Sequence, residues 1–340
     1  TVHDEPEHAR RQILNNLHNQ QPDGFLPGSL WMRKATMPWA RGDEPAKRFN
    51  IDASHPPVWP IAVDEYFART GDRDLLRTAL GALRRLIGWF EAARRAEPEG
   101  FYYRDIFDRR WESGIDEGIR FDDAPRAALA CVDATSHVYL MYDRAADWAG
   151  RLNEPQADLV SRRDTLGEFM RGRMFSDRTG LFHDIWSLSG EARPPLAFEG
   201  IWPMVVGAAS PQQAQRVIDQ NLLSDRRFFT QHPIATVGVE ESAFSLRMWR
   251  GPTWNSMSFW AALGCVRHGR PDAAKLLLER ALNASAKVFA ATGTIWEFYD
   301  PHGGDPRKLQ RKPHTPFNAP CPDYLGHNPL IAMARMWAGV

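Results

Sequence analysis

The spacing of apolar residues predicts helices along nearly the whole chain. Apolar residues recur every third or fourth position, which is the period of a helix that buries one face. The clearest segment is 73–95, where a leucine-rich stripe runs to Phe90 and Asp72 can cap the helix start. Further helices are expected at 5–19, 57–69, 132–150, 154–174, 198–208, 211–222, 253–268, 271–289 and 325–338. Because two-residue alternation is scarce and short, we expect an all-α protein.

A glycine followed by aromatic and acidic residues recurs after several predicted helices. The three clear occurrences begin at Gly100, Gly180 and Gly293, and a weaker one begins at Gly24. Glycine can end a helix in a left-handed conformation, so we expect each glycine to stop its helix and the next residues to lie in loops. If helix pairs form a ring, these loops would gather aromatic rings and carboxylates around one mouth.

Length supports a ring of helix pairs in one domain. Twelve helices of roughly 11–15 residues with their connections use about 340 residues. The stretches at 20–56, 98–127, 223–252 and 296–324 exceed plain connectors, and loops of that length usually carry function. With no linker or shift in composition, we expect a single domain over 1–340.

Charge and cysteine content exclude several classes of partner. The chain has 42 Lys and Arg against 42 Asp and Glu, so no net field attracts nucleic acid or an acidic membrane. It contains no apolar run of 18 residues, which argues against membrane insertion. Its three cysteines show no disulfide or zinc-ribbon spacing, and no signal peptide is visible. We expect a cytoplasmic protein, although a removed leader stays open and the oligomeric state is undetermined.

An acidic, glycine-containing loop is the first candidate for chemistry. Five acidic residues fall between Trp111 and Asp123, with Asp116 near the middle. A general acid needs a carboxyl whose pKa is raised by an apolar wall or by a like charge, and this loop offers both. A solvated acidic loop is the alternative interpretation.

Glu297 is a single carboxylate among the aromatic residues Trp296, Phe298 and Tyr299. A buried acid is costly unless it is paired or used in a reaction. The acidic residues and the histidine at 300–305 could alternatively hold a cation, but their spacing matches no calcium loop, and we expect no metal.

A third group lies at the start of the helix predicted from residue 253. Arg250, Trp254 and Asn255 follow or flank a Gly-Pro break and could offer donors and a stacking face to a polar ligand. Core packing is the alternative for Trp254, and it is the favoured interpretation for Trp260. His55 and Trp59 lie in and beside a proline-rich loop and could also bind ligand.

Signatures of other enzyme classes are missing. The sequence has no HExxH, GxSxG, Walker or GxGxxG pattern, so zinc proteases, serine hydrolases, nucleotide hydrolases and dinucleotide enzymes lack their usual marks. We therefore expect no cofactor.

Several motifs, in order, resemble the inverting glycoside hydrolases of the trehalase-like and processing-glucosidase-like families 37 and 63. The segment Glu-Ser-Gly-Ile-Asp116-Glu-Gly-Ile-Arg120 is similar to their acidic signature. Trp-Arg250-Gly-Pro-Thr-Trp254 and Glu297-Phe-Tyr-Asp-Pro resemble two further segments. The resemblance covers about 20–338 and departs from the pattern at Glu-Gly-Ile before Arg120.

The resemblance implies an (α/α)6 barrel that hydrolyses a small glucoside or mannoside with inversion. Asp116 then matches the general acid and Glu297 the general base, which in inverting enzymes lie roughly 6.5–9.5 Å apart. The partner is a small carbohydrate. The residues expected to contact it are Trp111, Arg120, Arg250, Trp254, Asn255, Trp296, Tyr299, His55 and Trp59.

Two other functions stay open at this point. A sugar epimerase or isomerase on a related barrel would use paired histidines, for example two of His55, His183, His232 and His314. A carbohydrate-binding protein without catalysis would need only the aromatic and polar contacts.

Overall fold

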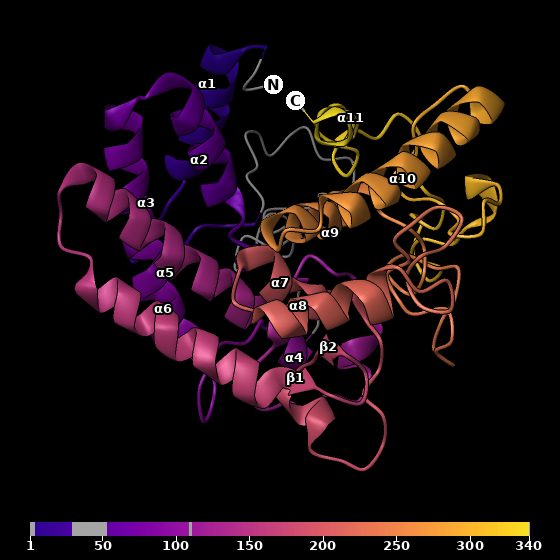
Figure 1. Cartoon of the computed structure of the whole chain (residues 1–340), viewed down its shortest axis with the longest axis horizontal. Coiled ribbons are helices and arrows are strands. Elements are labelled where there is room, and N and C mark those ends of the chain that lie inside the picture. Colours follow the sequence, from indigo (N-terminus) through magenta and orange to yellow (C-terminus); the bar gives the residue numbers. More distant parts are fainter. Residues whose placement is uncertain (1–3, 29–52, 109–110, 340) are drawn as a thin grey trace. The chain divides into compact units, whose positions relative to one another are not determined.

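The computed structural model describes residues 4–28, 53–108 and 111–339. They fall into two compact units, which are described separately (Figure 1). Unit 1 comprises Thr1–Ile115 and Arg126–Phe169, and unit 2 comprises Asp116–Pro125 and Met170–Val340. The described residues form helices and loops with a single two-stranded sheet, so the prediction of an all-α chain is confirmed. Within these residues, no helix is long and apolar enough to cross a membrane.

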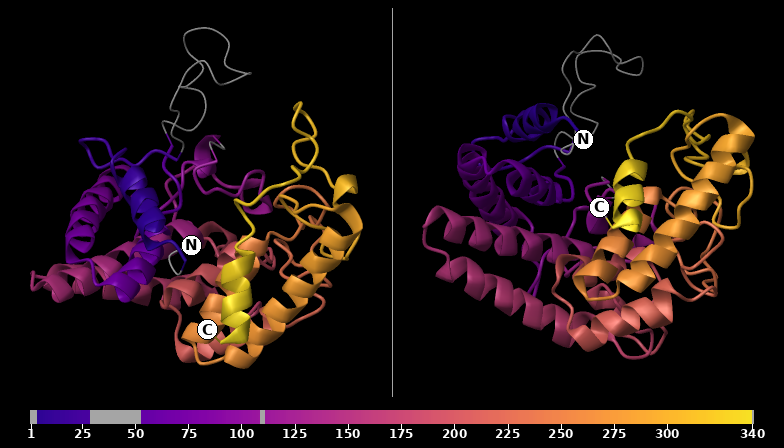
Figure 2. Two further views of the ribbon diagram at one scale, coloured as in Figure 1. Left: turned by 90° about the horizontal axis from the view of Figure 1, so that it is seen from above. Right: turned by 45° about the horizontal axis from the view of Figure 1, so that its top comes forward.

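Unit 1 is built from the helices predicted for the first half of the chain and from the short helix α4, which was not predicted. They are α1 (Pro6–Leu17), α2 (Trp59–Thr70), α3 (Arg73–Ala93), α4 (Asp105–Asp108), α5 (Val132–Leu152) and α6 (Ala157–Phe169). Helix α5 packs against α3 and against α6, and α5 and α6 run side by side (Figures 1 and 2).

The apolar stripe of α3 is the core of unit 1. Asp72 caps the helix by accepting hydrogen bonds from the backbone N–H groups of Asp74 and Leu75. Phe90 is fully buried and meets the ring of Tyr103 edge-on, with the ring centroids 6.5 Å apart. The predicted N-cap and the predicted core role of Phe90 are both confirmed.

Unit 2 contains the remaining elements. The α-helices are α7 (Trp202–Val206), α8 (Pro211–Val217), α9 (Asn255–Arg267), α10 (Pro271–Thr292) and α11 (Leu330–Ala338). The strands are β1 (Phe175–Ser176) and β2 (Leu181–Phe182). Short 3₁₀ segments are η3 (Ile119–Phe121), η5 (Ile185–Leu188), η6 (Phe198–Ile201) and η8 (Pro306–Lys308), and π-helical turns are η4 (Met170–Met174) and η7 (Ile218–Leu222).

Helix α9 packs along α10, and α11 also lies beside α10 (Figures 1 and 2). Gly264 lets α9 approach α7 closely, because a β-carbon at this position would come within 2.5 Å of the Met204 methyl group. Trp260, which was expected in the core, is only half-buried and packs its ring against Trp202 with 5.7 Å between centroids.

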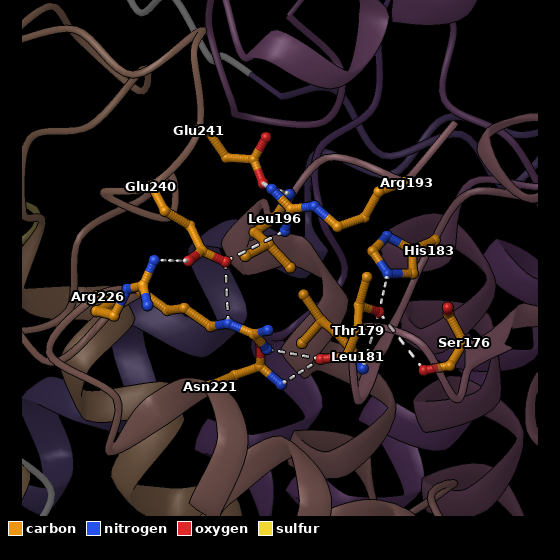
Figure 3. Close-up of polar contacts among 11 residues, drawn as sticks. Ser176, Thr179, Leu181, His183, Arg193, Leu196, Asn221, Arg226, Glu240 and Glu241 are labelled. Carbon is orange, nitrogen blue, oxygen red and sulfur yellow. Dashed lines mark hydrogen bonds and ion pairs between the residues drawn. The ribbon is translucent and has the colours of Figure 1, made fainter. Parts of the chain in front are cut away.

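Ion pairs join the loops of unit 2 near the β1–β2 hairpin (Figure 3). Arg193 binds Glu240 and Glu241, and Glu240 also pairs with Arg226 and Arg227. This network fixes the long connection between η7 and α9, in which no helix or strand is assigned.

Two expectations about the loops need correction. Among the glycines of the recurring glycine–aromatic pattern, only Gly293 ends its helix, as the left-handed C-cap of α10. Helix α3 already ends at Ala93, well before Gly100, and Gly180 lies in the turn of the β1–β2 hairpin. Helices α3, α5 and α10 have 21, 21 and 22 residues, which exceeds the length of roughly 11–15 residues assumed for twelve helices. Most of the long stretch at 20–56 lies outside the described residues.

Candidate active site

Asp116 lies in unit 2 with 19% of its side chain exposed, and its Oδ2 is 2.8 Å from Nζ of Lys312. Burial raises the pKa of the Asp116 carboxyl above its ordinary value, and Glu117 adds to the rise, while the charges of Lys312 and Arg311 oppose it. Burial exceeds the opposing charges. A carboxyl with a raised pKa stays protonated to higher pH, which is what a general acid needs.

Glu297 is almost completely buried, with 2% of its side chain exposed. Nε of Arg311 donates to both of its oxygens, at 3.0 and 2.8 Å, and the backbone N–H of Cys321 donates to Oε2 at 3.2 Å. The buried acid is therefore paired with a guanidinium and a backbone N–H, and these bonds fix the position of its oxygens.

Two consecutive residues connect the two carboxylates, since Arg311 binds Glu297 and Lys312 binds Asp116. Tyr324 lies within electrostatic reach of both. Burial raises the pKa of the Tyr324 phenol, and the charges of Glu297 and, to a smaller extent, Asp116 raise it further. Residues 181 positions apart in the sequence thus come to one place in unit 2.

Arg250 holds the acidic loop. Its guanidinium donates to the Glu117 carbonyl at 3.2 Å and to both oxygens of Asp122, at 3.1 and 2.7 Å. Arg247 pairs with the Glu117 carboxylate at 3.4 Å. Its Nε is buried without a partner among the described residues. Arg250 is thus occupied by the protein, whereas Arg247 retains one unused donor close to the acidic loop.

Arg120 is buried in unit 2 between two acids. It lies 2.6 Å from Asp184 and 3.1 Å from Glu199, and its guanidinium lies 4.2 Å from the ring centroid of Phe121. All three side chains are shielded from water, so removing Arg120 would leave two buried acids without this cation. The arrangement fixes the segment that carries Asp116.

Trp254 lies inside the protein rather than on an open surface. It is 1% exposed, and its ring stacks on Trp249 with centroids 3.9 Å apart and planes 3° from parallel. Its Nε1 donates to the Met248 carbonyl. These contacts match the core interpretation of Trp254 that the sequence left open.

Asn255 is fully buried and belongs to a network of polar side chains. Its Oδ1 is 2.9 Å from Nε2 of His232, and its Nδ2 donates to Ser285 and to Oδ1 of Asn328 at 2.8 Å. Asn328 in turn donates to the carbonyl of Trp296, the residue before Glu297. Asn255 therefore reaches the Glu297 segment through other residues.

Tyr299 and Trp296 are also held by this network. The Tyr299 hydroxyl donates to Asn328 at 3.1 Å and accepts from the backbone N–H of Trp296. The indole of Trp296 donates to Thr292, and 8% of the residue is exposed. Both residues flank Glu297 in the sequence and are fixed by this network, with Tyr299 in the interior.

The other predicted contacts, His55, Trp59 and Trp111, belong to unit 1. Nδ1 of His55 and Nε1 of Trp59 are buried without a partner among the described residues. Burial lowers the pKa of His55, so it is neutral at pH 7. Trp111 is half-buried in a left-handed conformation, φ 60°, which is uncommon for a residue other than glycine. Unused donors and strained backbone both occur often at ligand sites.

Glu112, in the same acidic loop, has a structural partner. Arg94 binds both of its oxygens at 2.8 Å, and the backbone N–H groups of Ser54 and Arg104 donate to it. Glu112 is therefore used to hold unit 1 together.

Two of the histidines considered for epimerase chemistry are engaged in the interior. His183 bonds to the Thr179 hydroxyl at 2.7 Å, as Figure 3 shows. Burial lowers the pKa of His183 to about 3 and that of His232 to about 4. Both are poor bases at neutral pH. The acidic residues near 300 are also occupied, since Asp305 binds Arg307.

Sequence reasoning missed five residues around the carboxylates: Arg247, Arg311, Lys312, Tyr324 and Asn328. The length of the stretch 296–324 was a signal that it carries function, but it did not indicate which side chains turn toward Glu297 and Asp116. In the sequence, Arg311 and Lys312 are two consecutive basic residues of a kind that is common on protein surfaces, so nothing marks them as partners of the carboxylates.

Comparisons with known proteins identify the class. A family model described as mannosylglycerate hydrolase MGH1-like glycoside hydrolase domain matches residues 2–318. The chain therefore belongs to this family and is a glycoside hydrolase, as predicted. No curated relative matches the sequence.

Solved structures show the same fold at low sequence identity. GH63 mannosylglycerate hydrolase from Thermus thermophilus in complex with Tris is 16% identical, with a TM-score of 0.71 over 99% of this chain and 90% of that one. The complex of the same enzyme with glucose is 18% identical, with a TM-score of 0.68 over 98% of this chain and 89% of that one. Neutral trehalase Nth1 from Saccharomyces cerevisiae is 17% identical, with a TM-score of 0.62 over 86% of this chain and 65% of that one. The predicted all-α, (α/α)6 fold class is confirmed.

Proposed function

We propose that this glycoside hydrolase cleaves an α-glycosidic bond in a small glucoside or mannoside with inversion of configuration. Asp116 is the general acid that protonates the leaving oxygen, and Glu297 is the general base that activates water. The main support for this proposal is that two consecutive residues bind the two carboxylates, Arg311 binding Glu297 and Lys312 binding Asp116. The two carboxyls differ as the roles require, because Asp116 has a raised pKa and Glu297 is bound by cationic and N–H donors.

The remaining predicted residues take roles consistent with their contacts. Trp296, which adjoins Glu297 in unit 2, contacts the sugar. For His55, Trp59 and Trp111 in unit 1, sugar contact stays a prediction; the first two each have a buried ring nitrogen without a partner among the described residues. The residues with protein partners keep the carboxylates in position: Arg120, Arg250, Trp254, Asn255 and Tyr299.

An acidic leaving group is the favoured substrate feature. Solved structures of similar fold include a GH63 mannosylglycerate hydrolase in complex with Tris and D-glycerate. In this chain Arg247 has an unused buried Nε and lies next to Glu117, which adjoins Asp116. Arg247 is thus available to bind a carboxylate on the leaving-group side of the acid.

The first test is a substrate panel of trehalose, kojibiose, nigerose, mannosylglycerate and glucosylglycerate. Mannosylglycerate and glucosylglycerate give the clearest readout, because glycerate has no anomeric centre. Proton NMR of the sugar that they release should first show the β-anomer, and first release of its α-anomer would refute inversion. Tight binding of the panel without any turnover would instead favour a carbohydrate-binding protein, and a product of unchanged mass would favour an epimerase.

The second test replaces each carboxylate. Asp116→Asn and Glu297→Gln should each lower kcat by at least about 10³-fold, because each removes a proton-transfer group and its charge. Glu168→Gln, on the exposed side of α6, is the matched control and should retain normal turnover. Circular dichroism checks that the variants fold. Near-normal activity in either site variant contradicts its assigned role.

A further inference from the structure

A groove of about 740 Å³ runs along one face of α10 in unit 2. Glu279, Arg280, Asn283 and Lys287 line its helical wall, at spacings that place them on one face. Its opposite wall includes Gln231, His232 and Gly303, from loops before α9 and after Glu297. The volume lies within the range of roughly 300–1,000 Å³ that is usual for small-molecule sites. No residue of the proposed catalytic pair lines this α10 groove.

The groove contains two cations that have no carboxylate partner among the described residues. Arg280 is held by the protein, with its guanidinium carbon 3.7 Å from the Phe229 ring centroid and Nη1 3.4 Å from the Thr230 carbonyl. Neither contact neutralises its charge. Arg270, at the start of the same helix, shows the usual alternative, since it pairs with both Asp219 and Asp272.

The rest of the lining combines the apolar residues Leu276, Ala284 and Val288 with polar residues of low net charge. Gln231 and Asn283 offer amide donors and acceptors, and His232 is neutral at pH 7 because burial lowers its pKa to about 4. Glu279 is the single acid, so with Arg280 and Lys287 the lining carries a net charge of about +1. Gly303 keeps the opposite wall open, because a β-carbon there would lie 2.7 Å from Oε1 of Gln231.

We propose that the α10 groove is a second ligand site, which binds a small hydroxylated anion through Arg280, with Lys287 and the two amides as further contacts. An ordered guanidinium without a counter-charge favours a carboxylate or a phosphate, which it can bind with two parallel hydrogen bonds. The amides suit the hydroxyl groups of such a ligand. Seven positions on a helix span about 10.5 Å, so Lys287 would contact the far end of the ligand rather than the same oxygen atoms.

Isothermal titration calorimetry on the full chain tests the site with two probes, inorganic phosphate and D-glycerate. We expect saturable binding of at least one probe, weakened at least tenfold by Arg280→Met and less by Lys287→Met. The matched control is Lys275→Met on the same helix, whose ammonium lies over Trp337 outside the groove. It should bind as the wild type does. The stronger probe distinguishes a phosphate from a carboxylate ligand.

A parallel titration of Asp116→Asn separates this site from the proposed active site. Binding in the groove should survive Asp116→Asn, and hydrolysis by Arg280→Met should keep its kcat. The proposal is overturned if neither probe binds saturably, if Arg280→Met binds as tightly as Lys275→Met, or if only the Asp116 variant loses binding. None of these outcomes would change the assignment of Asp116 and Glu297, which rests on hydrolysis.

Discussion

Individual charges decide how the two proposed catalytic carboxyls differ. Asp116 and Glu297 each have a cationic neighbour, yet Asp116 has a raised pKa because burial outweighs the ammonium of Lys312. Glu297 instead has two bonds from Arg311 and one from a backbone N–H. In the proposed mechanism the same functional group, a carboxyl, thereby takes two roles according to its surroundings.

Lys312 should set the upper limit of the active pH range. Its positive charge favours the ionised form of Asp116, so Lys312→Met should raise the pKa of that carboxyl further. The fall of kcat/KM on the alkaline side should then move to higher pH. Lys308→Met, in the same loop, is the control. A shift of the alkaline limb to lower pH would contradict Lys312's role.

Asn328 should act on catalysis by positioning. It holds the Trp296 carbonyl and the Tyr299 hydroxyl, on both sides of Glu297. Asn328→Ala should lower kcat by about 10- to 100-fold with little change in KM, because a displacement of about 1 Å at the base is costly. Ser256→Ala, which removes a bond to neighbouring His327, should have a much smaller effect. A change confined to KM would indicate direct substrate contact instead.

At the scale of elements, the helices follow from local sequence. Asp72, the stripe of α3 and the Gly293 end of α10 are visible in the sequence because capping and burial act over one or two turns. The Gly100 and Gly180 predictions were wrong because the same residue type also serves in turns and hairpins. The sequence pattern cannot distinguish these uses.

The α3 cap gives a stability prediction. Asp72→Ala should lower the free energy of unfolding by about 1 kcal/mol, since two backbone N–H groups lose their acceptor. Asp74→Ala, at an exposed position in the first turn, should cost only about 0.3 kcal/mol through its pair with Arg77. Urea denaturation followed by circular dichroism measures both. Equal losses of unfolding free energy in the two variants would contradict the capping role of Asp72.

At the scale of the whole molecule, the buried histidines should make the protein sensitive to acid. His183 and His232 have pKa values of about 3 and 4 when folded, against an ordinary value of 6.5. Below pH 6.5 these histidines bind protons in the unfolded chain but stay neutral in the folded chain. Their contribution to the free energy of unfolding is therefore greatest above pH 6.5 and falls toward pH 4. For His232 the full loss is on the order of 3 kcal/mol.

Denaturation midpoints between pH 7 and pH 4 measure this effect. His183→Gln keeps a polar partner for Thr179 and removes the titrating group, so its stability should depend less steeply on pH than that of the wild type. His8→Gln, on the exposed surface of α1, should leave the slope unchanged. Identical slopes for wild type and His183→Gln would contradict the proposed cause.

The sequence by itself determined the helical class and most helix positions, because these depend on periodicity, and its short motifs predicted the two carboxylates. Only the tertiary structure decided which side chains meet them. It brings Arg311 and Lys312 to Glu297 and Asp116, and it buries Trp254 and Asn255 in the interior. Motif residues can either contact a ligand or support the residues that do. That choice depends on burial and on partners distant in the chain, which local sequence does not encode.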